Sequence, residues 1–394
     1  MTTIPTTSPT DALLGVYRKP PMELVRGAGV ELFDADGKAY LDFVAGIAVN
    51  ALGYGDAELM RVMRDATESG LVHTSNLYRT APGEQLAEKL TGRTFADRVF
   101  LSNSGAEANE GAFKIARRWA RTMGGASKHE IIALRGAFHG RLFGTLAATD
   151  RPSYRAPFRP LAGGISIVER DLEELDAALN PETVAAVIAE PVQGEGGVRV
   201  LEHSFLQALR EMTAQRGIAL ILDEIQCGYG RTGTFLAHEQ AGIVPDLLTV
   251  AKPMAGGLPM GAILATKAVA DVMQPGDHGT TFGGGPFVAS VASYVFDRLS
   301  DSALLTHVTE QGAWLGAALR GLAERNTRIR AVRGTGLMWG IDIVDPAKDV
   351  IGRAMEMGLL ICSAGEHTIR LLPPLVMTRR DLERGVELLT RAIG

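Results

Sequence analysis

The chain has 394 residues, of which 46% are hydrophobic, and a formal net charge of −5 with acidic and basic residues interspersed. A chain of this length and composition can bury a large core and is expected to form two domains. No basic block marks a nucleic-acid or membrane surface, and no apolar run approaches the length of a membrane span.

The two cysteines, Cys227 and Cys362, are too few for a disulfide framework and lack the spacing of metal ligands. The Thr- and Pro-rich start carries neither the basic nor the apolar region of a secretion signal, and we expect it to be disordered. These features predict a cytoplasmic protein with no bound metal, no nucleic-acid partner and no membrane anchor.

In residues 1–55 the hydrophobic pattern is short and interrupted by many turn-forming residues. The segment VELFDADGKAYLDF predicts a β-hairpin that turns at Asp36-Gly37. From 56 to 285, helical periods alternate with the apolar runs RVFLS, EIIALRG, ISIVE, AAVIAEP, ALILDEI, DLLTVAK and GAILAT. This alternation predicts a large α/β domain in which helices cover both faces of a mostly parallel sheet.

Residues 286–394 begin with a long helical pattern and end with another at TRRDLERGVELLTRAIG. Between them, strands are predicted at IRAVRGTGLMWGIDI, LLICSA and IRLLPP. Together with 1–55, this part is predicted to form a smaller α+β domain built from the two chain ends.

Parallel sheets bind ligands at the carboxyl ends of their strands, so the residues after each apolar run are candidates for a site. In LSNSGAEANEGAFKIARRWA, a Ser-Asn-Ser-Gly loop leads from a strand into a helix that begins near Ala106. The N–H groups at Ser104, Gly105 and Ala106 can hold a phosphate there. An ordinary helix N-cap is the alternative, and no GxGxxG or Walker-type pattern supports a nucleotide.

The loop AFHGRLFG follows the run EIIALRG. Phe138 in this loop can offer its ring to a planar cofactor, and Arg141 can bind a carboxylate in bidentate fashion. We interpret His139 mainly as a structural hydrogen-bonding residue.

Asp223 ends the apolar run ALILD, where a carboxylate is costly without a cationic partner such as a protonated pyridine nitrogen. Gln226 can donate to a phenolic oxygen on the same ring. Lys252 follows the run LLTV, and a lysine buried there can condense with an aldehyde. Caps, structural ion pairs and a solvated strand-end lysine are the alternatives.

An anion site, an aromatic ring, a carboxylate and a lysine, all at strand ends, are the groups that pyridoxal phosphate requires. Its ring accepts the electron pair left when Cα loses a proton, and Asp223 would keep the ring nitrogen protonated. Lys252 would hold the cofactor and move the proton between Cα and the C4′ carbon. The sequence therefore predicts Lys252 and Asp223 as catalytic residues.

The ordered motifs SNSGAEAN, AFHGR, EPVQGEGG, LDEIQCGYGRTG, AKPMAGGLPMGA and HGTTFGGGP resemble the class III (ω-type) aminotransferases of the fold-type I pyridoxal-phosphate superfamily. The resemblance covers nearly the whole chain and implies a seven-stranded, mostly parallel sheet flanked by helices. Within the family, GIAVNALG, HTSNLY and FADRVFLSNSGAEANE are most similar to the acetylornithine aminotransferases of arginine biosynthesis.

The resemblance also implies roles for individual residues. It assigns to the cofactor the residues Gly105, Ala106, Phe138, Asp223, Gln226 and Lys252. Thr281 would reach the cofactor phosphate of a neighbouring subunit, which implies at least a homodimer with shared active sites. Thr280 and Arg141 would contact the acylated substrate, Arg141 through a carboxylate.

Glu195 of QGEGG and Arg370 of TIRLLPP match an ion pair that opens and closes in the family. Glu195 would neutralise Arg370 while the amino donor is bound, and Arg370 would be released for the carboxylate of 2-oxoglutarate. One pocket would then serve both halves of a ping-pong reaction. A plain structural ion pair is the alternative.

The predicted reaction moves the ω-amino group of N2-acetyl-L-ornithine to 2-oxoglutarate. Succinylornithine, ornithine, 4-aminobutyrate and a carrier-linked lysine are alternative donors, because IRLLPPL also resembles 4-aminobutyrate aminotransferases. An aminomutase, which would need no added oxo acid, is the alternative from another enzyme class. A relative that only binds ligands is disfavoured because Lys252 and Asp223 are both retained.

Two segments depart from the subfamily pattern. Gly53-Tyr54-Gly55-Asp56 stands where a histidine-containing turn is usual, and Gly285 replaces the usual asparagine. Both lie near the expected substrate channel and subunit interface. They therefore bear on donor or acceptor preference more than on the class of reaction.

Overall fold

The structure is a computed structural model that describes residues 13–17 and 21–394. The Thr- and Pro-rich start, for which we expect disorder, lies mostly outside these residues. Within the described ranges, no helix is long and apolar enough to cross a membrane.

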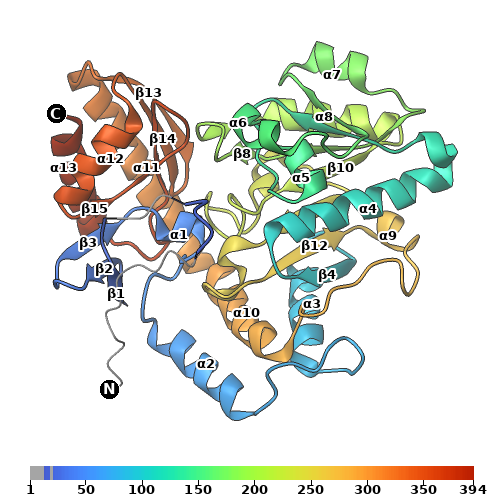
Figure 1. Ribbon diagram of the computed structural model, residues 1–394, viewed down its shortest axis with the longest axis horizontal. Coiled ribbons are helices and arrows are strands. Elements are labelled where there is room, and N and C mark those ends of the chain that lie inside the picture. Colours follow the sequence, from blue (N-terminus) through green and yellow to red (C-terminus); the bar gives the residue numbers. More distant parts are fainter. Residues whose placement is uncertain (1–12, 18–20) are drawn as a thin grey trace.

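A seven-stranded sheet forms the centre of the larger part of the molecule (Figure 1). Its strands, in spatial order, are β4 (Arg98–Ser102), β12 (Gly261–Ala265), β11 (Leu247–Val250), β10 (Ala219–Asp223), β7 (Val184–Ala189), β5 (Glu130–Leu134) and β6 (Ile165–Val168). Strand β12 runs antiparallel to both of its neighbours, and the other pairs are parallel. The mostly parallel sheet predicted from the apolar runs is confirmed.

The strands are largely apolar, as a sheet with helices on both faces requires. On β5, Ile131 and Ala133 pack in one cluster with α4 (Gly105–Gly124). Ile132 and Leu134 belong to the cluster on the other face, which includes α7 (Leu172–Ala178) and α8 (His203–Gln215). Since successive side chains of a strand point to opposite faces, a sheet buried on both sides requires a continuous apolar run.

Three longer helices pack below the sheet in the view of Figure 1, where α10 contacts both α2 and α3. Their bounds are α2 (Ala57–Glu68), α3 (Ala81–Arg93) and α10 (Pro286–Leu299). The shorter elements of the connections are α1 (Ala45–Ala48), α5 (Phe143–Ala147), α6 (Pro152–Arg155), α9 (Lys267–Ala270), β8 (Val192–Gln193), β9 (Arg199–Val200) and the 3-10 turns η1 (Gly125–Ser127), η2 (Ala156–Phe158), η3 (Ala237–Ala241) and η4 (Lys252–Ala255).

The first strands and the C-terminal part of the described chain form the smaller part of the molecule, at the left of Figure 1. Strands β1 (Leu24–Ala28), β2 (Glu31–Asp34) and β3 (Ala39–Asp42) form an antiparallel sheet. The predicted turn at Asp36-Gly37 connects β2 to β3, with Gly37 at a φ of 84°. Strand β15 (Leu359–Leu360) pairs in parallel with β3 and so joins the two ends of the chain.

A second sheet follows the order β13 (Ile329–Thr335), β14 (Met338–Ile343), β17 (Thr368–Leu371), β16 (Cys362–Ser363). The helices of this part are α11 (Ser302–Arg325), α12 (Ala347–Glu356) and α13 (Arg379–Ile393). The run LLICSA, expected as one strand, is split between β15 and β16, which belong to different sheets. The domain division at 1–55, 56–285 and 286–394 stays a prediction, which the pairing of β15 with β3 supports.

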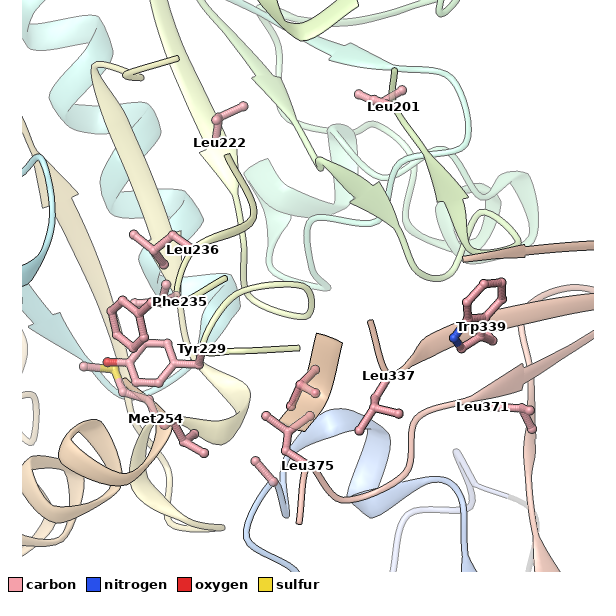
Figure 2. Packing of buried hydrophobic residues seen from close by; sticks show 14 of the residues in the cluster. Leu201, Leu222, Tyr229, Phe235, Leu236, Met254, Leu337, Trp339, Leu371 and Leu375 are labelled. Atoms are coloured by element: carbon pink, nitrogen blue, oxygen red, sulfur yellow. The ribbon is translucent and has the colours of Figure 1, made fainter. Parts of the chain in front are cut away.

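Figure 2 shows where the two parts meet: Tyr229, Phe235 and Met254 gather on one side, and Leu337 and Leu375 on the other. The guanidinium of Arg231 is buried in the same region and donates to the main-chain oxygens of Leu337 and Pro373. Burial lowers the pKa of Arg231 to about 9, while Asp42 opposes this change. The contacts of Arg231 connect the β10–η3 loop to the segments that precede β14 and follow β17.

Candidate active site

A cavity of about 420 Å³ lies at the carboxyl ends of the parallel strands. Most of the predicted site residues line it: Ser104, Gly105, Ala106, Phe138, Arg141, Glu195, Asp223, Gln226 and Lys252. They come from the loops after β4 and β5, the turn between β8 and β9, the end of β10 with the residues after it, and the start of the segment after β11. The sheet therefore brings residues that are distant in sequence to one cavity, as expected for strand ends of an α/β fold.

Lys252 follows β11 and faces this cavity. Its backbone has a φ of 23°, which residues other than glycine rarely adopt. Such backbone strain is common at functional sites. Desolvation lowers the pKa of Lys252, and Arg370 lowers it further, whereas the carboxylates of Asp223 and Glu195 raise it. The net lowering favours the neutral amine, which is the nucleophilic form.

Asp223 ends β10 and is only 4% exposed. Its Oδ2 accepts from Asn109 Nδ2 at 2.8 Å and lies 2.8 Å from His139 Nδ1, which we take to carry the ring proton. Thr249 donates to Asn109 Oδ1 at 2.7 Å and so fixes the orientation of that amide. Asn109 and His139 thus fix the orientation of the Asp223 side chain at the wall of the cavity.

The start of α4 supplies the expected anion site. Ser104 Oγ accepts from Glu107 N at 3.2 Å, and Glu107 Oε2 accepts from Asn103 N at 2.7 Å. These two bonds satisfy the N–H groups of Glu107 and Asn103, while the remaining N–H groups of the first turn, at Gly105 and Ala106, have no intrahelical partner and line the cavity. A Cβ at Gly105 would lie 2.7 Å from Ile225 Cδ1, so a larger residue here would displace the Ile225 side chain.

Phe138 and Arg141 lie on the loop after β5. The Arg141 guanidinium stacks 3.4 Å from the centre of the Tyr154 ring and 6.0 Å from that of Phe138. Arg141 is exposed at the mouth of the cavity, where a cation–π contact restrains a side chain that is free to meet a carboxylate.

Glu190, which the sequence analysis did not single out, lines the same cavity and is 6% exposed. It accepts from Phe138 N at 2.8 Å and from Gly194 N at 3.4 Å. Burial raises the pKa of Glu190 to about 7, an effect that His139 opposes and Asp223 reinforces. A carboxylate after the wholly apolar run AAVIA is the same signal that identified Asp223, and it could have identified Glu190 too.

Glu195 and Arg370 form an ion pair at the edge of the cavity. Arg370 Nη2 lies 2.6 Å from Glu195 Oε1, and Arg370 Nη1 donates to Gln226 Oε1 at 3.1 Å. Because the oxygen of Gln226 faces Arg370, its Nε2 is left to donate elsewhere, as the predicted bond to a phenolic oxygen requires. A Cβ at Gly194 would overlap the side-chain oxygen of Gln226, so a larger residue there would displace this amide.

Thr280 and Thr281 lie outside this cavity, in a separate hollow that they line with Asn76, Tyr78 and Gly285. Thr280 accepts from Asn103 Nδ2 at 2.8 Å through its hydroxyl and from Asn76 Nδ2 at 2.8 Å through its carbonyl. The fold of one chain thus does not bring these threonines beside Lys252. Their roles stay predictions, as do those of the other site residues.

The residues around the cavity fit pyridoxal phosphate by their chemistry. Asp223 offers a carboxylate to a cationic ring nitrogen, Gln226 an amide donor, the start of α4 a site for a phosphate and Lys252 an amine for an aldehyde. Within the described residues, each of these groups is thus matched to a different part of the cofactor.

Comparisons with known proteins agree with this reading of the cavity. A family model described as Aminotransferase class-III matches residues 16–393. The chain is 41% identical over 386 residues to the mitochondrial acetylornithine aminotransferase of Alnus glutinosa, which covers 97% of this chain and 85% of that protein.

Two solved structures resemble the fold over nearly its whole length. The ornithine aminotransferase of Toxoplasma gondii gives a TM-score of 0.92 at 30% identity, covering 97% of this chain and 92% of that one. The N-acetylornithine aminotransferase of Stenotrophomonas maltophilia gives 0.84 at 37% identity, covering 95% and 96%. These similarities confirm the predicted fold class.

Proposed function

The chain belongs to the class-III aminotransferase family, and we propose that it transfers the ω-amino group of N2-acetyl-L-ornithine to 2-oxoglutarate, a step of arginine biosynthesis. Membership of the family makes the protein a pyridoxal-phosphate-dependent aminotransferase, as predicted. The choice of donor is supported by relatives named acetylornithine aminotransferase, which are 38–44% identical over at least 94% of the chain.

When bound, pyridoxal phosphate supplies an aldehyde for amines and a ring that withdraws electrons from the adjacent substrate carbon. We propose that Lys252 anchors it through the Nζ amine and later accepts the proton from the carbon that carries the donor's ω-amino group. Asp223, held by Asn109 and His139, keeps the proton on the ring nitrogen. Glu190 and Phe138 also line the cavity, where Glu190 accepts from Phe138 N.

The observation that carries the proposal is the pair of Glu195 and Arg370 beside the lysine. Arg370 is 2% exposed and fixed by its strand, whereas Glu195 is 24% exposed and lies on a glycine-rich turn. Glu195 can therefore move while Arg370 stays in place. With the pair closed, the pocket accepts a donor with no second carboxylate at this point; with Glu195 displaced, Arg370 binds a carboxylate of 2-oxoglutarate.

Ornithine is the second candidate donor, because the chain also matches the fold of an ornithine aminotransferase closely. The two donors differ in one group: acetylornithine carries a neutral amide where ornithine carries an ammonium. A pocket built for the amide must leave that ammonium without its hydration or a counter-ion, which disfavours free ornithine.

We further propose a homodimer located in the cytoplasm. The hollow of Thr280 and Thr281 lies beside apolar side chains that are unusually exposed for a single chain: Leu77 at 82%, Tyr78 at 73% and Phe282 at 65%. A second copy that covered them would also bring Thr281 to a neighbouring active site. Both cysteines are free thiols, in keeping with a reducing compartment.

The test is the amino-donor preference of the purified, cofactor-loaded enzyme. N2-acetylornithine, N2-succinylornithine, ornithine and 4-aminobutyrate are compared by kcat/KM with 2-oxoglutarate as acceptor. We expect the acetylated donor to exceed free ornithine by about a hundredfold or more, the ratio that an unpaired buried charge gives. Comparable use of ornithine would refute the proposed donor, and turnover without any oxo acid would indicate an aminomutase.

A further inference from the structure

Helix α1, at the edge of the cavity, is a left-handed turn. Its four residues have positive φ angles: 49° at Ala45, 63° at Gly46, 64° at Ile47 and 64° at Ala48. Only one of them is glycine, and alanine and isoleucine rarely adopt this backbone conformation. Such strain persists where the surroundings fix the backbone, and it is common next to functional sites. The turn therefore requires a physical restraint.

Asp42 and Tyr54 provide that restraint. The Asp42 carboxylate is 1% exposed and accepts from Val44 N at 2.8 Å, from Ala45 N at 3.0 Å and from the Tyr54 hydroxyl at 2.6 Å. Desolvation and the charge of Asp42 raise the pKa of Tyr54, so the hydroxyl keeps its proton and donates. Two main-chain donors and one side-chain donor thus fix the first residues of the turn.

Space for the Tyr54 ring is provided by a glycine. A Cβ at Gly27 would lie 2.7 Å from Tyr54 Cβ, so the strand β1 can pass the ring only without a side chain there. Asn50 Nδ2 also donates to the Tyr54 hydroxyl at 3.3 Å. The tyrosine is therefore connected to both ends of the left-handed turn, through Asp42 before it and Asn50 after it.

The turn reaches the active-site cavity on two sides. Val49, the next residue, lines the cavity together with Lys252 and Gly257. Ala48 packs in a buried cluster with Val192 and Val198, which flank the segment that carries Glu195. A change in the backbone of the turn would thus move an apolar wall of the cavity.

We propose that Asp42 and Tyr54 are positioning residues for the amino donor, holding α1 left-handed so that Val49 forms a fixed apolar wall against the donor's aliphatic chain. This inference rests on the proposed transfer reaction. It also gives Tyr54, which departs from the subfamily pattern, a defined task at the site. Neither residue lines the cavity itself, so both act through the turn.

The chain contains a matched control in the β2–β3 hairpin. There the Tyr40 hydroxyl donates to Asp34 Oδ2 at 2.7 Å, and Asp34 Oδ1 accepts from Asp36 N at 3.1 Å and Lys38 N at 2.9 Å. Two main-chain N–H groups and one tyrosine hydroxyl thus surround this aspartate as they do Asp42, but its hairpin does not line the cavity. Tyr40→Phe therefore removes an equivalent bond without touching the turn.

The experiment compares Tyr54→Phe with Tyr40→Phe in the cofactor-loaded enzyme. We expect amide hydrogen exchange at Val44 and Ala45 to become about five- to tenfold faster in Tyr54→Phe only, the effect of losing one buried hydrogen bond. The donor KM should rise by a similar factor in Tyr54→Phe and stay at the wild-type value in Tyr40→Phe. Asp42→Asn, which retains one acceptor oxygen, should reproduce these changes and replaces Tyr54→Phe if that variant does not fold.

A double-mutant cycle tests whether Tyr54 acts through Val49. If it does, Tyr54→Phe should raise the donor KM less in a Val49→Ala background than in the wild type. Exchange rates and donor KM that match those of Tyr40→Phe would overturn the inference. If wild-type enzyme does not use N2-acetylornithine, the proposed donor is wrong, and the same comparison with the donor that it does use still decides the role of Tyr54.

Discussion

Arg370 and Glu195 form an ion pair of unequal partners: the guanidinium is 2% exposed and the carboxylate 24%, with 2.6 Å between Nη2 and Oε1. Removing the partner of a buried charge costs more free energy than the pair contributes. The enzyme can tolerate an opened pair only when another anion takes the place of Glu195. The substrate carboxylate is such an anion, so the pair links the choice of substrate to the cost of an unpaired cation.

Substitution of Glu195 by alanine should therefore affect the two half-reactions differently. We expect the KM for the amino donor to rise about tenfold or more, because Arg370 is left unpaired while the donor is bound. The KM for 2-oxoglutarate should stay constant or fall. Single-turnover spectra of each half-reaction measure this, with Glu195→Gln as the variant that keeps the size of the side chain. Equal weakening of both half-reactions would support a structural ion pair instead.

Lys252 should make the cofactor-free protein less stable at neutral pH than a variant with methionine at this position. Because desolvation lowers its pKa below 10.5, Lys252 binds more protons in the unfolded chain than in the folded chain, and its contribution to stability rises with pH up to about that value. Lys252→Met should thus unfold at a higher temperature at pH 7, with a difference that narrows towards pH 10.

The control for this comparison is Lys267→Met, since the Lys267 side chain is 66% exposed and pairs with Asp271 on the same helix face. It should show no gain that depends on pH. Thermal unfolding of the cofactor-free proteins at several pH values measures the difference. A gap between Lys252→Met and wild type that widens as the pH rises would contradict a lysine with a lowered pKa.

Glu190 should have the opposite dependence on pH. Its pKa in the folded protein is raised from 4.5 to about 7, so its contribution to stability is complete below pH 4.5 and is lost as the pH rises through about 7. Glu190→Gln removes this loss. The free energy of unfolding of the variant, relative to wild type, should rise by about 3 kcal/mol between pH 4.5 and 8.

Denaturant unfolding of the cofactor-free proteins across this range tests the expectation for Glu190. The hydrogen bonds that Phe138 N and Gly194 N donate to Glu190 differ in strength from those to the amide of the variant. Above pH 7 this difference in free energy does not depend on pH. A constant offset between Glu190→Gln and wild type from pH 5 to 8 would show that Glu190 titrates normally.

The features that were predicted correctly are those that a short segment of sequence shows by its own hydrophobic pattern. A strand buried on both faces must be apolar throughout, so the runs located the strands of the central sheet, and the polar residues that follow them, such as Asp223 and Lys252, were found at the cavity. The split of LLICSA between β15 and β16 has no such local pattern, because it depends on which distant strand each half pairs with.

The left-handed turn is a second feature that local patterns could not reveal. GIAVNA contains one glycine and apolar residues that suit a strand or a helix, and its conformation is set by Asp42 and by the Tyr54 hydroxyl, twelve residues further along the chain. Asn109 was missed for a similar reason, since this residue of α4 owes its importance to Asp223 and Thr249 on two strands of the sheet. Residues that act through long-range hydrogen bonds need the folded chain to be recognised.

A mixed dimer can decide whether Thr281 serves the active site of the neighbouring subunit. Lys252→Ala lacks the anchor amine, and Thr281→Asp places a negative charge where the cofactor phosphate is expected, so each variant alone should be inactive. In a heterodimer with shared sites, one site combines Lys252 from one chain with Thr281 from the other and is intact. Random mixing makes about half of the dimers mixed, each with one working site, so about a quarter of wild-type activity should return. If native mass spectrometry shows the mixed dimers and no activity returns, Thr281 belongs to the site of its own chain.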